Sequence, residues 1–536
     1  MEINRNITMN QVTWFVVMLL GFLLAVFMGS AVGSADFSSV SIVLGVGIGV
    51  SVTLLLGSKY WLLIPFSLAA DQLPTIPVGG RAVEFPELAI IACTFMFLLR
   101  LATRKEKLII WRPASIPFLL FIGWVGMVFV LNPVGMGAMG STIGGGRFYI
   151  KLVLAFSGFL ILSGRTYTER DMRWMLGFIL LGAFFTLGYG FMSHALAGPP
   201  VDAATGIMID QYYTWHQELT VVAFTVAYLI FARWSPKEVF TLQRAWVALA
   251  YLACLLLVLL SGKRMGVVAV FLAPLVSSVL SRQFIHVFIA AILATACLAF
   301  LVAGHGSWFH LPLVAQRTIS FLPGDWDAEM QGMRGGADEW RAELRYWALE
   351  NVKKDPLIGQ GFSVNLNETT GAILAQERGG DMNVQVASMA LGRSWHNMWL
   401  GYAADFGIPL SVLQGIILLT VLVLSYRCFK YYGKTSSFGI FAAYLILYTL
   451  RDIVTSYTGG HSSLDAWQRW WMYGVLISIY YTLPNRQKFM THRVKHPSPR
   501  NESAPIVALP IRGQRAPTGA SPWPKIPGRG KSPTKH

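Results

Sequence analysis

Residues 284–303 read FIHVFIAAILATACLAFLVA and contain no Asp, Glu, Lys or Arg. As an α-helix rising about 1.5 Å per residue, this run is about 30 Å long, which matches the hydrocarbon core of a bilayer. Similar runs recur along almost the whole chain of 536 residues, which is 54% hydrophobic and only 13% charged. Soluble domains carry about 25% charged residues. The composition therefore predicts a polytopic membrane protein.

Apolar windows long enough to suggest spans can be drawn from one end of the chain almost to the other, and they predict an all-α transmembrane bundle of about 12–14 helices. The windows are residues 12–30, 40–56, 59–70, 85–101, 114–131, 147–163, 172–195, 219–232, 245–260, 265–280, 284–303, 408–426, 437–450 and 469–483. The weakest is 59–70, because it is short and contains Pro65. Half of a broken helix is one interpretation of it.

The Lys and Arg content of the short loops predicts the orientation of the spans, since cytoplasmic loops carry an excess of positive charge. The loop at 100–112 is rich in Lys and Arg, whereas 132–146 has no charge before Gly146 and 194–218 has acids but neither Lys nor Arg. The positive loops fall on one side when the spans are counted in order. Both termini are therefore expected in the cytoplasm.

Four parts are expected along the chain. Residues 1–303 hold the first transmembrane helices, to about the eleventh, and 304–397 form a large outward-facing loop with short helices. Residues 398–483 hold a re-entering helix and the last spans. Residues 484–536 form a basic, disordered cytoplasmic tail, with eleven Lys and Arg against one acid, or +10 of the net +16. Because few aromatic residues accompany these charges, anionic lipid headgroups are the expected partner of the tail rather than nucleic acid.

Positive charges on the outward side are exceptions that orientation does not explain. Lys263 and Arg264 end the turn SGKR (261–264), and Arg147 and Lys151 begin another apolar run. A phosphate or diphosphate suits the planar fork of donors of an arginine. The alternative is that such side chains reach lipid headgroups, which we expect for Lys263 and Lys151. Arg264 is the predicted anion-binding residue.

The large loop carries two more arginines on one expected helical face. Arg341 and Arg345 lie four residues apart in a helix-like stretch, 338–347, which leads to the turn sequence DPLIGQG (355–361). Residues at this spacing share a helix face. They are expected either to bind an anion or to pair with neighbouring glutamates on an exposed helix.

The chain returns to the membrane at a histidine flanked by tryptophans. The sequence SWHNMWL (394–400) is followed by an expected helix break at GIP (407–409), with Pro409 as the first residue of the next span. Most lone histidines are structural. His396 faces the same side as the exceptional arginines, where a general base for a hydroxyl is needed, and we predict it as the catalytic residue.

Other polar residues are weaker candidates. His216 and His461 lie outward near the bilayer, where they either line a pocket or serve only the structure. Asp325 and Asp327 have the spacing of metal-binding acids, but a solvated acidic loop is the preferred interpretation, so neither a metal site nor a cofactor is predicted. The chain has no P-loop, no GxGxxG after a strand, no HExxH and no GxSxG, which leaves the corresponding chemistries without support.

Four pieces, taken in order, resemble the O-antigen ligase and polymerase superfamily of bacterial envelope glycosyltransferases. They are SGKR at an outward helix end, an Arg-then-Trp helix (341–347), DPLIGQG, and His396-Asn397 followed by ADFGI (404–408). The similarity covers about residues 255–430, and the many spans with one large late loop extend it in layout to the whole chain. Glu343 stands where the family's loop arginine is usual, so Arg341 and Arg345 are both candidates, and Asp405 replaces the common Glu.

The resemblance implies a multi-pass protein of the bacterial inner membrane with a periplasmic site. It implies an inverting, metal-independent glycosyltransferase that moves a glycan from an undecaprenyl diphosphate carrier to a hydroxyl of lipid A core or of another glycan. Protein O-oligosaccharyltransfer and lipid-linked glycan flipping without transfer are the alternatives. The resemblance implies His396 as base, with Arg264 and either Arg341 or Arg345 on the diphosphate. Arg147 is a further candidate for the diphosphate, and the expected supporting residues are Lys263, Asn397, Asp405, His216 and His461.

Overall fold

The computed structural model describes residues 56–70, 76–78, 81–106, 112–133, 146–197, 216–320, 322–362, 395–456 and 467–483. These residues belong to one compact unit within Met1–Leu483. They are helical except for turns and one β-hairpin, in which β1 (Ile76–Val78) pairs antiparallel with β2 (Arg81–Val83). The predicted all-α polytopic bundle is confirmed, with this short hairpin as a local addition.

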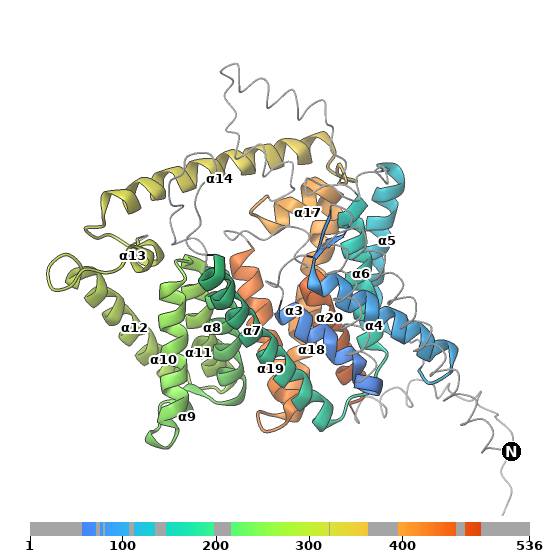
Figure 1. The fold of residues 1–536 in the computed structure, drawn as a ribbon, viewed down its shortest axis with the longest axis horizontal. Helices are drawn as coiled ribbons and strands as arrows, with labels where there is room; N and C mark the ends of the chain where they lie inside the picture. Colours follow the sequence, from blue (N-terminus) through green and yellow to red (C-terminus); the bar gives the residue numbers. More distant parts are fainter. Residues whose placement is uncertain are drawn as a thin grey trace, which may run out of the picture. The chain divides into compact units, whose positions relative to one another are not determined.

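Figure 1 shows the helices in their order along the chain. The first part holds η1 (Gly57–Leu62), α3 (Leu63–Ala69), α4 (Phe85–Ala102), η2 (Pro113–Ser115), α5 (Ile116–Leu131), α6 (Gly146–Ser163), α7 (Glu169–Ala197), α8 (His216–Arg233), α9 (Pro236–Val239), η5 (Leu242–Arg244) and α10 (Ala245–Leu260). The second part holds α11 (Arg264–Leu280), α12 (Phe284–Gly304), α13 (Leu313–Ile319), α14 (Ala328–Lys354), α17 (Met398–Phe406), α18 (Ile408–Tyr432), α19 (Ser437–Thr455) and α20 (Trp467–Tyr481).

Within the described residues, seven helices are long and apolar enough to cross a membrane. They are Phe85–Ala102, Pro113–Leu131, Glu169–Met192, Leu242–Leu260, Phe284–Gly304, Ile408–Tyr432 and Ser437–Thr455. Each coincides with a window drawn from the sequence. The weak window at 59–70 forms η1 and α3 in direct succession, and the windows at 12–30 and 40–56 lie outside the described residues.

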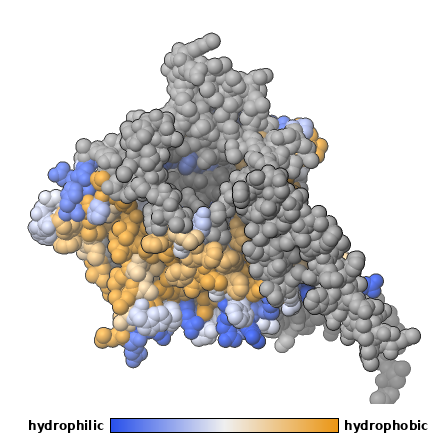
Figure 2. Space-filling view, in the orientation of Figure 1, coloured by the Kyte–Doolittle hydropathy of each residue, from blue (hydrophilic) through white to orange (hydrophobic). Residues whose placement is uncertain are grey.

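The outer faces of these helices are apolar where a soluble protein would be polar. On α12 the side chains of Ile285, Phe288 and Ile292 are each at least two-thirds exposed. Figure 2 shows a hydrophobic band over α10, α11 and α12, with hydrophilic residues along its lower margin. Apolar surface of this extent belongs against lipid tails, since helices satisfy their own backbone hydrogen bonds there.

Close helix packing in the core depends on small residues and on aromatic contacts. A Cβ added at Gly474 of α20 would lie 2.6 Å from the Phe159 carbonyl oxygen of α6, so only glycine permits this approach. Phe118 of α5 stacks on Phe159 at 4.7 Å between ring centroids. Trp470 of α20 meets Phe121 of α5 edge to face at 4.9 Å. These contacts join α5, α6 and α20 into the support on which α17 rests.

Candidate functional site

Asn397 fixes the start of α17. Its side-chain oxygen accepts a hydrogen bond from the Leu400 N–H at 3.0 Å, which is the usual arrangement of an N-cap. The Met398 N–H donates to the Ser456 carbonyl oxygen at 3.0 Å, at the end of α19. Asn397 is almost wholly buried, so it orients the entry to the helix, and His396 with it, through the backbone.

The two glycine-containing motifs that the sequence analysis placed apart along the chain lie against each other. The N–H groups of Gln360 and Gly361 donate to the carbonyl oxygens of Ala404 and Asp405, at 3.1 and 2.7 Å. The Ile408 N–H donates to the Pro356 carbonyl oxygen at 2.8 Å. These three backbone hydrogen bonds hold the DPLIGQG loop (355–361) against the end of α17.

Glycine is required at two points of this contact. A Cβ at Gly359 would lie 2.5 Å from the Phe406 nitrogen, and a Cβ at Gly407 would overlap the Leu357 carbonyl oxygen. Gly407 also has φ 83° and ψ 162°, a region of backbone space open almost only to glycine. The expected helix break before Pro409 is present, because α17 ends at Phe406 and α18 begins at Ile408.

Asp405 is a buried acceptor. Its side chain has no exposed surface, and its Oδ1 accepts a hydrogen bond from the Trp395 indole N–H at 3.1 Å. Trp395 directly precedes His396 in the chain. Asp405 therefore supports the histidine by holding its neighbour.

His396 itself has a strained backbone. Its φ is 49°, in the left-handed region that few residues other than glycine adopt, and its side chain is only partly buried. Such strain persists only where the surroundings enforce it, and it collects at functional sites. Trp395 on one side and the Asn397 cap on the other supply that enforcement.

The loop arginines are carried by a helix that packs on the histidine segment. Leu344 and Ala348 of α14 form a small buried cluster with Trp395 and Ala404. Arg341 and Arg345 border this stripe at helical spacing and are partly buried. They therefore lie on the part of α14 that faces α17, which Figure 1 shows beneath one end of the long helix.

Arg264 is the first residue of α11, after a turn in which Gly262 has φ 66°. Its Nε donates to the Arg317 carbonyl oxygen at 3.2 Å and its Nη2 donates to Ser320 Oγ at 3.0 Å. Both acceptors lie at the end of α13, which also contacts α14. Arg264 therefore has a structural task as well as any role toward a ligand. Lys263 precedes it at the N-cap position and is partly buried.

Three other predicted site residues are not placed in this arrangement. Arg147 lies in the first turn of α6 and His216 begins α8, but their side chains lie outside the described part. His461 lies outside the described residues altogether. Lys151, which was expected to reach lipid headgroups, is instead nearly buried and pairs with Glu84 at 2.5 Å between Nζ and Oε1. Glu84, the N-cap residue of α4, is therefore the anionic partner of Lys151, in place of the expected lipid headgroup.

The sequence analysis missed a buried ionic group close to His396. Asp452 near the end of α19 accepts from Arg451 Nη2 at 2.7 Å and lies 2.9 Å from Arg469 Nε, measured to Oδ2. Arg469 Nη1 lies 3.6 Å from Met398 Sδ. Charged residues in an otherwise apolar helix were the available signal, but the window drawn from the sequence ended at 450, directly before the Arg451-Asp452 pair.

Several helices with apolar outer surfaces, together with α14 packed against α17, define a multi-pass membrane protein. Residues 248–415 match the family model described as O-antigen ligase. The match supports the predicted resemblance to the O-antigen ligase superfamily. No curated protein matches the chain.

Proposed function

We propose that this protein transfers a glycan from an undecaprenyl diphosphate carrier to an acceptor hydroxyl at the periplasmic face of the bacterial inner membrane. The transfer inverts the anomeric centre and uses no metal. The acceptor is lipid A core or another glycan. Both termini of the chain lie in the cytoplasm under this proposal, because the positively charged short loops then face inward.

One observation carries the proposal. The helix with Arg341 and Arg345 packs on the segment that holds His396, through Leu344 and Ala348 against Trp395 and Ala404. A general base, His396, and the guanidinium groups of Arg341 and Arg345 thus belong to two segments that pack against each other. This is the set of groups that a metal-independent reaction on a lipid diphosphate needs.

The chemistry follows from the charges that develop. His396 accepts the proton of the acceptor hydroxyl while its oxygen attacks the anomeric carbon. The bond from that carbon to the diphosphate oxygen breaks, and the lipid diphosphate leaves with the electron pair. Arg264 and one of the α14 arginines stabilise the negative charge on the leaving group, since a guanidinium matches phosphate oxygens in geometry and charge. The activated lipid supplies the driving force.

The test uses the full chain in proteoliposomes with a lipid-linked oligosaccharide and an acceptor glycan. His396→Asn keeps a residue that tolerates the left-handed backbone but removes the base, and we expect it to lower transfer by about 100-fold or more. Full transfer by this variant would overturn the proposal. Flipping of the lipid-linked glycan into sealed vesicles, with no transfer by the wild type, would instead assign a transport function.

The role of Arg264 needs a control because the side chain also binds α13. Arg264→Lys keeps the charge but loses the fork of donors, whereas Ser320→Ala removes one acceptor and leaves Arg264 in place. If Arg264 binds the diphosphate, Arg264→Lys lowers transfer by about 10-fold or more while Ser320→Ala stays near wild type. Equal, small losses in the two variants would assign Arg264 to structure alone.

A further inference from the structure

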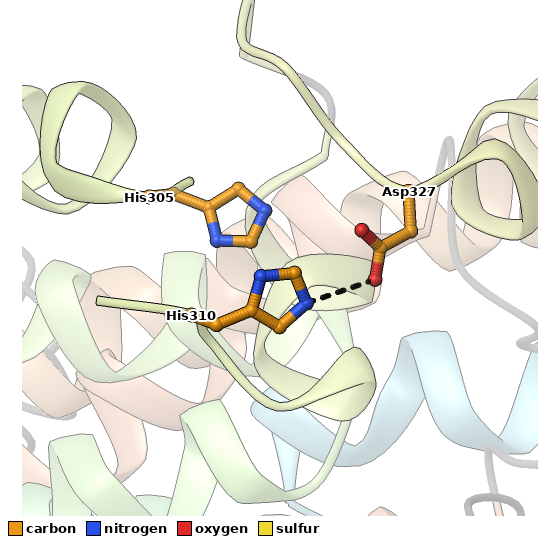
Figure 3. A group of neighbouring side chains, drawn as sticks. All are labelled: His305, His310 and Asp327. Carbon is orange, nitrogen blue, oxygen red and sulfur yellow. Dashed lines mark hydrogen bonds and ion pairs between the residues drawn. The ribbon is translucent and has the colours of Figure 1, made fainter. Parts of the chain in front are cut away.

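His305, His310 and Asp327 lie together at the corner where α12 ends and α14 begins. Each offers one ligand atom, and these atoms lie within 4.8 Å of one another. Figure 3 shows the two imidazole rings and the carboxylate converging, with His310 Nε2 at 3.3 Å from Asp327 Oδ2. We propose that this corner is a binding site for a divalent transition-metal ion of the zinc type, separate from the glycan-transfer step.

The donor set selects the ion. Two imidazole nitrogens and one carboxylate oxygen suit zinc and its neighbours, while calcium and magnesium prefer oxygen ligands only. The histidines are separated by four residues, a spacing common in zinc sites. Ligand atoms around one zinc ion lie about 3.3 Å apart in tetrahedral geometry, so binding requires the side chains to move inward by about 1 Å. The fourth position is left for water.

Residues behind the ligands already orient them. The Gln316 side chain is wholly buried, and its Nε2 donates to Asp327 Oδ2 at 2.8 Å while its Oε1 accepts from the Asp327 N–H at 3.1 Å. Trp326 stacks on the His305 ring at 5.2 Å between centroids. Such outer contacts are typical of protein metal sites.

The corner also contains hydrogen bonds that metal binding would change. His305 Nδ1 accepts from the Leu311 N–H at 3.2 Å. If the metal binds Nε2, the ring proton must reside on Nδ1, and this bond to Leu311 is given up. Metal binding therefore breaks the hydrogen bond from the Leu311 N–H to His305. In exchange, the metal ion connects His305 at the end of α12 to Asp327 at the start of α14. The expected consequence is a more stable corner beneath the helix that carries Arg341 and Arg345.

Asp325 and Asp327 were both expected on a solvated acidic loop, but the structure gives them different surroundings. Asp325 is exposed, whereas Asp327 faces the histidines and Gln316. Trp326, which separates the two acids in the sequence, is buried. Sequence spacing alone did not connect Asp327 with His305 and His310, because the acid lies 17 residues beyond His310. Asp325 therefore serves as a matched control for Asp327.

The test is zinc binding by the full chain, purified in detergent without a polyhistidine tag and treated with a chelator. Calorimetric titration with Zn²⁺ should show one saturable site. Thermal unfolding scans should show a higher unfolding temperature with Zn²⁺, and Mg²⁺ should produce neither effect. His310→Ala should abolish saturable binding, and because this side chain is 66% exposed the variant should fold normally. Asp327→Asn should also lose binding, while Gln316→Ala should weaken it by about 10- to 100-fold.

Asp325→Asn and His286→Ala serve as controls that keep wild-type zinc affinity, since neither residue belongs to the cluster. The proposal is overturned if the wild type shows no saturable zinc binding, or if His310→Ala and Asp327→Asn bind zinc as tightly as the wild type. Because the readouts are binding and unfolding temperature, loss of transferase activity is not part of this test.

Discussion

Arg469 and Asp452 form an ion pair in which neither side chain has more than 2% of its surface exposed, with 2.9 Å between Nε and Oδ2. The two residues belong to α20 and α19, and Arg451 binds the other oxygen of the same carboxylate. Arg469 also reaches Met398, two residues after His396. A buried carboxylate shared by two guanidinium groups thus ties the last two helices to the segment that holds the predicted base.

Asp452→Asn should destabilise the protein strongly, because it leaves two buried guanidinium groups without their anion. We expect a loss of about 3–5 kcal/mol in the free energy of unfolding, measured by denaturant unfolding in detergent. Glu350→Gln is the matched control, since its partner Lys353 is 69% exposed and water screens such a pair, so this variant should lose much less stability. Equal losses in the two variants would contradict a structural role for the buried group.

Gly407→Ala should displace the DPLIGQG loop from the end of α17. The added methyl group overlaps the Leu357 carbonyl oxygen, and the backbone at φ 83° is closed to alanine. Backbone strain alone costs about 1–3 kcal/mol, so a clear fall in unfolding temperature is expected. Gly123→Ala in α5 has open space around it and should leave the unfolding temperature unchanged or raise it. A stable Gly407→Ala protein would show that the loop contact is dispensable.

Trp395→Phe should lower stability by removing the indole donor from the buried Asp405 carboxylate. A buried acceptor that loses this bond costs about 1–3 kcal/mol. Asp405→Asn, which still presents a carbonyl oxygen to the indole, should cost less. Transfer activity should fall further than stability in Trp395→Phe, because the adjacent His396 loses its support. Unfolding midpoints and initial transfer rates of the same preparations separate the two effects.

The stability of His396 variants should depend on whether the new residue tolerates the left-handed backbone conformation, φ 49°. Asn accepts a positive φ, whereas Val does not, because its branched Cβ crowds the left-handed conformation. His396→Asn should therefore unfold at nearly the wild-type temperature, and His396→Val should be destabilised by about 1–3 kcal/mol. Thermal unfolding in detergent checks both. If Val is tolerated as well as Asn, the segment between Trp395 and Asn397 does not hold His396 in its strained conformation.

Several local features were predictable because they depend on neighbouring residues alone. Apolar runs predicted helices such as α12, and Pro409 predicted the start of α18, since proline suits the first turn of a helix. Asn397 and Asp405 were identified through their motif, but the sequence did not show that one caps a helix and the other accepts from Trp395. Arg451, Asp452 and Arg469 were missed because their meaning depends on two helices meeting.

The sequence by itself determined that the chain enters a membrane as helices, because twenty apolar residues in a row have no other stable solution in lipid. Its motifs also predicted a resemblance to the O-antigen ligase superfamily, which the match over residues 248–415 supports. Only the tertiary structure decided which polar residues meet: Lys151 with Glu84, Arg264 with Ser320, and Asp327 with His310. Each pairing joins segments that local sequence patterns treat separately, and packing of the helices brings them within hydrogen-bond reach.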